Sequence, residues 1–216
     1  DYYDYLLHDD GTLDVVIADV SGHNIGAALI MAEARTFIQA EARNLEGTHQ
    51  IMAALNSFFF QSLVKVEMFI TMFYVKYVPK TRKIIYSNAG HNLPLIWRER
   101  EQRFQHLDAQ GLIFGIVPDA DYEEKLDFLK PGDFLCLYTD GITESKNEQG
   151  VFFGEERLCA LLREHHRDSP QDMIDRLLER LHDFSGTSTF RDDVSLVIMR
   201  VTEDEKDEPG AHRSGQ

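Results

Sequence analysis

Aspartates stand at the ends of several expected strands that lie far apart in the sequence. They are Asp1, Asp19, Asp140 and the adjacent pair Asp192 and Asp193. Carboxylate oxygens are the ligands that hard divalent cations prefer, and a neighbouring glycine lets backbone and ligand approach closely. Carboxylates that converge without a cation would raise one another's pKa values, so convergence would indicate a metal centre. Each acid taken singly is more typical of a turn or a strand cap, and spacing alone does not show convergence.

Hydrophobic periodicity predicts the elements that would carry these acids. Strands are expected at 2–7, 13–20, 67–77, 83–87, 93–97, 122–128, 133–138 and 194–201. Helices are expected at 25–42, 48–64 and 155–165, and another begins at Pro170 with Ser169 as its N-cap. The first two strands form a hairpin, and those at 122–128 and 133–138 are expected to pair around the turn at Pro131. Runs of strands separated by pairs of helices predict an α+β fold with an antiparallel sheet core.

Two segments carry expectations about exposure. The rings of Phe58, Phe59 and Phe60 cannot all face one side of a helix, so one of them is expected to project outward and contact a second copy, a linker or an upstream domain. A Ser substitution at Phe60 would test this contact. The segment 98–103 alternates arginine with glutamate and is interpreted as a solvated hairpin loop.

Composition excludes several classes of function. The chain has 22 basic and 37 acidic residues and a net charge of −15, which disfavours nucleic acid and anionic membrane surfaces as partners. No apolar run approaches the roughly 18 residues that span a bilayer, so direct membrane insertion is not expected and the protein is predicted to be cytoplasmic. Cys136 and Cys159 are too few for a disulfide framework and are interpreted as buried, reduced thiols. No glycine-rich phosphate-binding loop follows a strand.

The length of 216 residues predicts one domain, expected at residues 1–201. The polar stretch 202–216 is expected to be a disordered tail. The missing initiator methionine predicts a piece cut from a longer protein, with a truncated N-terminus.

Several sequence strings occur together in a fixed order. They are Asp1-Tyr2-Tyr3-Asp4, Asp19-Val20-Ser21-Gly22-His23, Ser87-Asn88-Ala89-Gly90-His91-Asn92, Pro131-Gly132-Asp133, Tyr138-Thr139-Asp140-Gly141-Ile142-Thr143-Glu144 and Arg191-Asp192-Asp193-Val194-Ser195-Leu196. Together they resemble the metal-dependent protein phosphatase (PPM) family, in its bacterial SpoIIE/RsbU branch of serine/threonine phosphatases. The resemblance implies an α-β-β-α sandwich of two antiparallel sheets flanked by helices.

The resemblance also implies a site at one end of the sandwich, with two Mn²⁺ or Mg²⁺ ions. Asp19 would be the bridging ligand, and Val20 would offer its backbone carbonyl. Asp140 and Asp192 would complete the coordination of the second metal ion, with Asp193 as the adjacent alternative to Asp192. Asp1 would act at the first metal, directly or through water.

Four further residues lie in the matched loops and are expected near the substrate: Gly22, His23, His91 and Gly141. The general acid is not assigned: His23, His91 and water on the metal are all candidates. For each histidine, a role in shaping its loop is the stronger expectation. The chain departs from the family at Asn24, where a glycine is usual, and lacks the glycines that precede Asp1. Retention of all the acids favours an active enzyme.

By resemblance, the function expected is hydrolysis of phosphoserine or phosphothreonine in a partner protein by two-metal-activated water, as the output domain of a bacterial signalling protein. The substrate would be a phosphorylated STAS-domain protein, an anti-sigma factor antagonist, and an upstream sensor or receiver domain and a homodimer are also expected. One alternative is a catalytically silent partner-binding module of the same fold. Another is a metal phosphoesterase acting on a small molecule.

Overall fold

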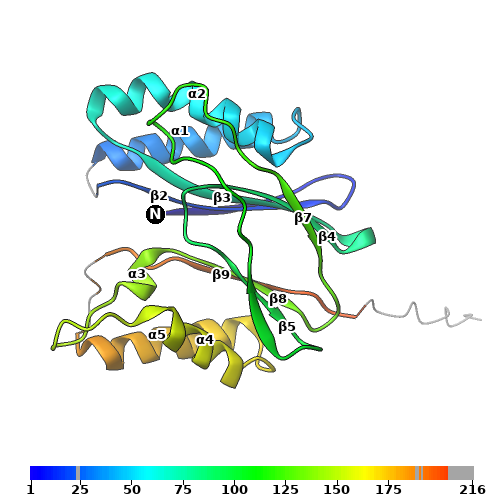
Figure 1. Ribbon diagram of the computed structural model, residues 1–216, viewed down its shortest axis with the longest axis vertical. Coiled ribbons are helices and arrows are strands. Elements are labelled where there is room, and N and C mark those ends of the chain that lie inside the picture. The colour runs from blue at the N-terminus through cyan, green and yellow to red at the C-terminus, as the bar shows by residue number, and fades with distance from the viewer. Residues whose placement is uncertain (23–24, 188–189, 191, 204–216) are drawn as a thin grey trace, which may run out of the picture.

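The computed structural model describes residues 1–22, 25–187, 190 and 192–203. These residues form four layers, in which two antiparallel sheets face each other and helices cover both outer faces (Figure 1). The fold is therefore the α-β-β-α sandwich expected from the sequence. No helix within the described ranges is both long and apolar enough to cross a membrane.

One sheet has five strands in the order β1-β2-β3-β4-β7. Its strands are β1 (Tyr2–Leu7), β2 (Leu13–Val20), β3 (Ile70–Val78), β4 (Lys83–Ala89) and β7 (Lys125–Phe128), with a short 3₁₀ turn, η1 (Pro79–Thr81), between β3 and β4. Helices α1 (Ile25–Glu41) and α2 (Thr48–Val66) cover its outer face. One face of each helix packs on this sheet, through residues such as Ile38 and Leu55, both fully buried. Burial of these apolar side chains holds the first two layers together.

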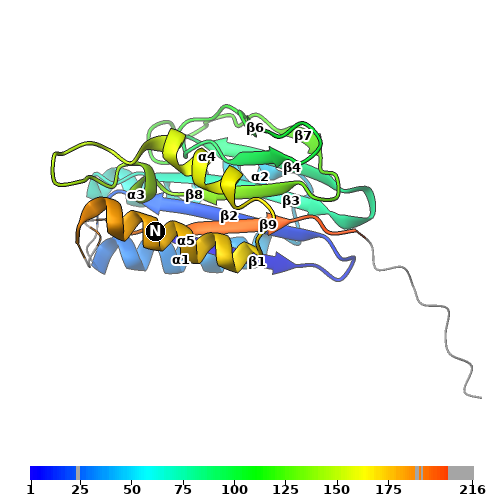
Figure 2. The same cartoon turned by 90° about the horizontal axis from the view of Figure 1, so that it is seen from below.

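The other sheet has four strands in the order β6-β5-β8-β9. Its strands are β5 (Leu95–Arg98), β6 (Arg103–His106), β8 (Phe134–Tyr138) and β9 (Leu196–Arg200). Helices α3 (Asp140–Thr143), α4 (Gly154–Glu164) and α5 (Pro170–Ser185) lie on this side of the sandwich, and Figure 2 shows α4 and α5 running along the sheet. The predicted N-cap is confirmed, because the Ser169 hydroxyl accepts a 3.1 Å hydrogen bond from the Asp172 amide.

The expected pairing of strands 122–128 and 133–138 is wrong. β7 pairs with β4 in the five-stranded sheet, whereas β8 pairs with β5 and β9 in the other sheet. The turn at Pro131 therefore carries the chain from one sheet to the other instead of closing a hairpin. β6 was not anticipated and forms the true hairpin with β5.

Of the two expectations about exposure, the one outward phenylalanine is confirmed and the solvated loop at Arg98 is wrong. Phe58 is the outward ring, at 55% exposure, while Phe59 is buried and Phe60 is half-buried. Arg98, expected in a solvated loop, is buried, and its guanidinium pairs with Asp127 and Asp133. These carboxylates neutralise the arginine, which is why the chain can bury it between the sheets.

The sheet registers place the acidic strand ends together. Asp19, near the end of β2, lies opposite Thr71 at the start of β3, and Tyr138, at the end of β8, lies opposite Leu196 at the start of β9. Asp140 follows β8, and the pair Asp192-Asp193 precedes β9, so these acids leave the four-stranded sheet at a single end. Both sheets thus contribute acids to the same end of the sandwich.

Candidate active site

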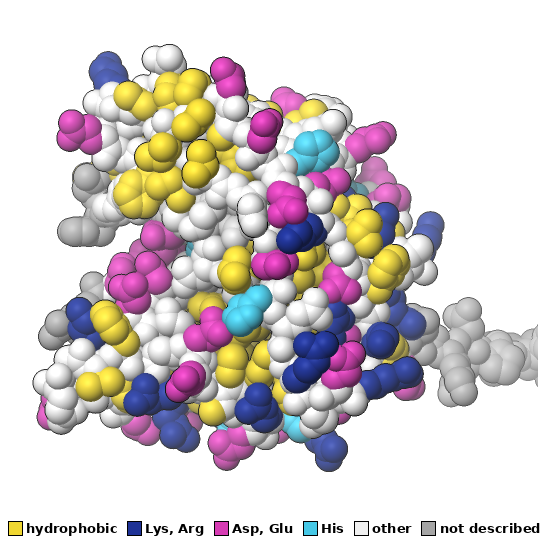
Figure 3. All heavy atoms as spheres, viewed as in Figure 1, with side chains coloured by type: hydrophobic (Ala, Val, Ile, Leu, Met, Phe, Trp, Pro, Cys, Tyr) yellow, Lys and Arg dark blue, Asp and Glu magenta, His cyan; other side chains and the backbone are white. Residues whose placement is uncertain are grey.

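Asp19 is the carboxylate whose surroundings are most unusual. Burial raises its pKa from 3.8 to about 6, the ammonium of Asp1 opposes that shift, and the carboxylates of Asp140, Asp192 and Asp193 add to it. Because these carboxylates affect the pKa of Asp19, the acids from β2, α3 and the segment before β9 lie near one another at this end of the sandwich. In the space-filling view, acidic side chains gather beside a hollow between the two halves of the molecule (Figure 3).

Asp1 is fixed by contacts on both sides of the site. Its carboxylate accepts a 2.7 Å hydrogen bond from the Thr139 hydroxyl, and its ammonium lies 3.2 Å from an Asp193 oxygen and 4.0 Å from an Asp19 oxygen. Thr139 is fully buried and also accepts a hydrogen bond from the Ser195 amide. Sequence reasoning quoted Thr139 within a motif but missed this role, for which its place beside Asp140 was the available signal.

Asp140 opens the short helix α3, and the next residue has to be glycine. A Cβ on Gly141 would lie 1.9 Å from the backbone oxygen of Asp193, far inside van der Waals contact. The absence of a side chain lets the segment before β9 pack against α3 and brings Asp193 and its neighbour beside Asp140. The Asp193 amide is held in turn by a 2.9 Å hydrogen bond to the Asp192 carboxylate.

The donor set suits a hard divalent cation. It consists of carboxylate oxygens carried by separate elements, with the backbone of Val20 at the end of β2. Within the described ranges, no three acidic, histidine or cysteine side chains lie close enough to hold one ion. The fit to a metal therefore rests on the chemistry of these oxygen donors and on their shared end of the sandwich, and not on a formed coordination cluster among the described residues.

The four loop residues expected near the substrate differ in their surroundings. Gly22 has φ of +99°, a conformation that favours glycine, and Gly141 packs as described above. His23 lies outside the described residues. His91 is 5% exposed, and its Nδ1 lies 2.8 Å from the Thr71 hydroxyl, so its ring is enclosed between the sheets.

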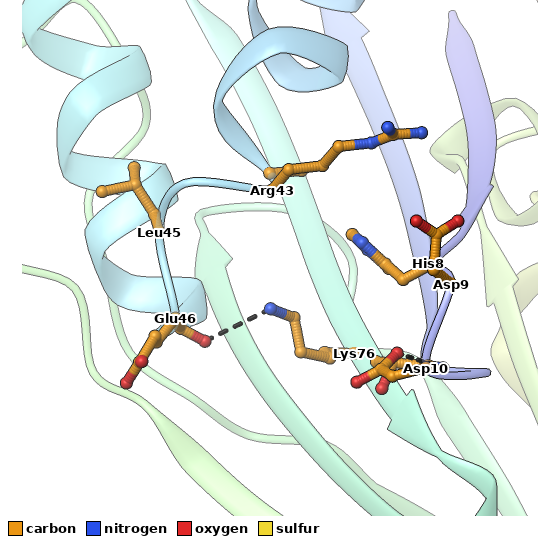
Figure 4. A pocket seen from close by; sticks show the side chains of 9 residues that line it. His8, Asp9, Asp10, Arg43, Leu45, Glu46 and Lys76 are labelled. Carbon is orange, nitrogen blue, oxygen red and sulfur yellow. Dashed lines mark hydrogen bonds between the residues drawn. The ribbon is translucent and has the colours of Figure 1, made fainter.

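Two cavities differ in their relation to these acids. One of 320 Å³ adjoins the site and has Gly141, Glu144, Lys146 and Asp192 in its lining. Another of 420 Å³ lies at the opposite end of the β1–β2 hairpin (Figure 4). There Lys76 donates to the Glu46 carbonyl at 3.2 Å, and none of the expected site residues lines the cavity. The candidate active site is therefore associated with the 320 Å³ cavity beside Gly141 and Asp192.

Comparison with known proteins agrees with this geometry. The SiaA-PP2C domain of Pseudomonas aeruginosa superimposes with a TM-score of 0.79 at 21% identity, covering 93% of this chain and 80% of that one. RsbX, crystallised in complex with magnesium, superimposes with a TM-score of 0.65 at 14% identity, covering 91% of this chain and 84% of that one. The sandwich with acids at one end is thus the fold of the PP2C phosphatases.

The family model for Stage II sporulation protein E (SpoIIE) matches residues 9–202. The chain is also 32% identical over 203 residues to phosphoserine phosphatase RsbU of Bacillus subtilis (strain 168), covering 93% of this chain and 58% of that protein. The chain belongs to the SpoIIE family, which confirms the resemblance drawn from its motifs. It spans little more than half the length of RsbU.

Proposed function

We propose that this chain is the catalytic domain of a metal-dependent protein phosphatase that hydrolyses phosphoserine or phosphothreonine. The observation that carries the proposal is the convergence of Asp19, Asp140, Asp192 and Asp193 at one end of the sandwich, where burial, with a smaller contribution from the other carboxylates, raises the pKa of Asp19 to about 6. Membership of the SpoIIE family and similarity to the phosphoserine phosphatase RsbU support it. The catalytic domain is assigned to residues 1–201.

The acids would hold two Mn²⁺ or Mg²⁺ ions. We assign Asp19 as the ligand shared by both ions, the carbonyl of Val20 as a backbone ligand, and Asp140 with Asp192 to the second ion. Asp1 would serve the first ion, directly or through water. When bound, such cations lower the pKa of water and neutralise phosphate oxygens. The crystal structure of RsbX with magnesium supports a divalent ion in this fold.

The chain's own residues favour attack by water over a covalent route. Burial raises the pKa of the Cys136 thiol far above its ordinary value and that of Cys159 to about 11, so neither is a thiolate at neutral pH. The carboxylates would repel a phosphate dianion if they were not neutralised, so substrate binding depends on cations at this site.

The finer substrate assignment rests on the family resemblance. We propose a phosphorylated STAS-domain partner, an anti-sigma factor antagonist, as the substrate, and an upstream sensor or receiver domain as the source of regulation. The resemblance also supports action in the cytoplasm. Cavity residues beside the acids, including Lys146 and Glu144, would meet the polypeptide that carries the phosphoserine.

The outer face of α1 and α2 is the surface we propose for contact with an upstream domain or a second copy of the chain. Leu29 is 61% exposed and Phe58 is 55% exposed, and both line a shallow apolar groove. Figure 3 shows hydrophobic side chains gathered on this half of the molecule. Phe58→Ser, in place of the substitution at Phe60, tests whether this face sets oligomeric state.

Hydrolysis of p-nitrophenyl phosphate in the presence of Mn²⁺ tests the proposed function. The wild-type chain should release nitrophenol, chelation should stop it, and Asp19→Ala and Asp140→Ala should abolish it. Asp175→Ala, on the exposed surface of α5, serves as the matched control. Absence of turnover with every divalent ion, together with retained binding of a partner protein, would instead identify a silent binding module.

A second pair of variants separates the adjacent acids. We expect Asp192→Asn to remove activity at all Mn²⁺ concentrations and Asp193→Asn to leave most of it, because Asp192 is the assigned ligand. The reverse result would move the ligand to Asp193, whose carboxylate lies 3.2 Å from the Asp1 ammonium.

A further inference from the structure

His91 is enclosed at the site end of the sandwich and is held there by its own loop. The Asn88 side chain accepts a 2.8 Å hydrogen bond from the His91 amide and donates a 3.0 Å hydrogen bond to the His91 carbonyl. Between them, Gly90 has φ of +65°, and a Cβ on it would lie 2.3 Å from the Ile113 side chain. The backbone therefore has little freedom to move the ring.

The ring reaches the residue beside Asp19. Its Nδ1 lies 2.8 Å from the Thr71 hydroxyl, and Thr71 is the cross-strand partner of Asp19. Directly opposed residues of an antiparallel pair project from the same face of a sheet. The Thr71 hydroxyl and the Asp19 carboxylate therefore share the face between the sheets, and the histidine holds the residue directly opposite Asp19.

The same ring faces the other sheet. Its Nε2 is buried without a hydrogen bond among the described residues, and the backbone of Tyr138 influences the ring's proton affinity. Tyr138 ends β8, and Asp140 follows it closely in the chain. Burial lowers the pKa of His91 to about 4, so the ring is neutral at physiological pH and adds no positive charge to compete with a cation.

We propose that His91 is a positioning residue, which sets the separation of Asp19 and Asp140 by bracing Thr71 of one sheet against the end of β8 in the other. The inference rests on the proposed function, because the acids it positions are the assigned metal ligands. His91 does not contact substrate in this role. Partners that orient metal ligands usually change metal affinity strongly when they are removed.

Direct Mn²⁺ binding, measured by electron paramagnetic resonance of the free ion, tests the proposal without relying on turnover. Thr71→Val removes the hydroxyl and keeps the shape, and we expect Mn²⁺ to bind about tenfold more weakly. Thr71→Ser should restore near wild-type binding. His91→Asn should weaken binding as well, because the shorter side chain cannot reach both the Thr71 hydroxyl and the backbone of Tyr138.

Thr48→Val is the matched control. Its hydroxyl makes a buried contact with Ser87 of the same 2.8 Å length, but lies at the start of α2, away from the acids. We expect a lower melting temperature with unchanged Mn²⁺ affinity. If Thr71→Val behaves like this control, His91 and Thr71 are merely structural and the proposal is wrong.

The wild type and Asp19→Ala separate failure of this inference from failure of the proposed function. Mn²⁺ binding that Asp19→Ala abolishes and Thr71→Val leaves intact would overturn only the role of His91. A wild-type chain that binds no Mn²⁺ would overturn both.

Discussion

The hydroxyl of Thr139 donates a 2.7 Å hydrogen bond to the carboxylate of Asp1 and thereby joins residues at distant positions in the chain. Thr139 is fully buried, and its oxygen also accepts the Ser195 amide at 3.1 Å. One side chain thus ties the start of β1 to the four-stranded sheet at the place where the acids converge.

Loss of this hydroxyl should destabilise the fold. Thr139→Val would leave the buried Ser195 amide without its partner, and we expect the free energy of unfolding to fall by about 1–3 kcal/mol. Thr139→Ser keeps the hydroxyl and loses one methyl group, so its effect should stay near about 1 kcal/mol. Urea unfolding followed by circular dichroism measures both. Equal losses for the two variants would show that packing, and not the hydrogen bond, is what matters here.

The buried arginine should be more costly to remove than an exposed one. Arg98→Met would leave Asp133, at 1% exposure, without the guanidinium that lies 3.1 Å away, and we expect a loss of about 3–5 kcal/mol. Arg103→Met breaks an exposed pair with Glu101 and should cost less than about 1 kcal/mol. Chemical denaturation of both variants under identical conditions measures the difference. Similar midpoints would contradict the larger cost expected for Arg98→Met.

Asp19 should make the metal-free protein less stable as pH rises. Its pKa of about 6 in the fold lies above the ordinary 3.8, so the folded state holds the proton more tightly and stability falls as pH increases from about 4 to 6. Asp19→Asn removes this penalty. Above pH 6 in chelator, the variant should be more stable than wild type by about 1–2 kcal/mol, allowing for solvent screening of a side chain that is 33% exposed. The expectation would be refuted if the melting temperatures of the wild type and Asp19→Asn changed in parallel across this pH range.

Adding Mn²⁺ should make the wild type more stable than Asp19→Asn, the reverse of the order expected in chelator. An ion at a hundred times its dissociation constant stabilises the folded state by about 2.7 kcal/mol, and only the wild type has the full set of ligands. A thermal shift of equal size in wild type and Asp19→Asn would argue against Asp19 as a ligand.

A methyl group at Gly141 should separate the acids of the site. Gly141→Ala places Cβ 1.9 Å from the Asp193 backbone oxygen, so the segment carrying Asp192 and Asp193 must move away from Asp140. We expect loss of Mn²⁺ binding and of phosphatase activity. Gly150→Ala is the control, because it meets nothing within 4 Å and bears only the strain of φ at +78°, about 1–2 kcal/mol. Retained metal binding in Gly141→Ala would show that the close packing is dispensable.

Local patterns predicted the parts of the fold that depend on neighbouring residues. The hairpin of β1 and β2 followed from β-branched residues around a Gly11 turn, and the start of α5 followed from Ser169 and Pro170. The α-β-β-α architecture and the SpoIIE family followed from the order of elements and motifs, and both are confirmed. The elements need only side-chain periodicity and local hydrogen bonds, which the sequence contains directly, whereas the architecture and the family followed from the resemblance of the motifs.

Contacts between distant segments required the tertiary structure. The turn at Pro131 shows that the chain bends, but the partner of β7 is β4, because a turn does not determine which sheet the next strand joins. Arg98 was misjudged for a related reason, and the sequence did not tell which of the three phenylalanines projects outward, since exposure depends on which element covers a residue.

The sequence by itself determined which acids stand at strand ends and which family the chain resembles. Only the tertiary structure decided that these acids lie near one another and that Thr139 and His91 lie beside them at the same end of the sandwich. The physical reason is that distances across the sandwich are set by sheet register and packing, and close packing such as that of Gly141 against Asp193 is invisible in a linear pattern.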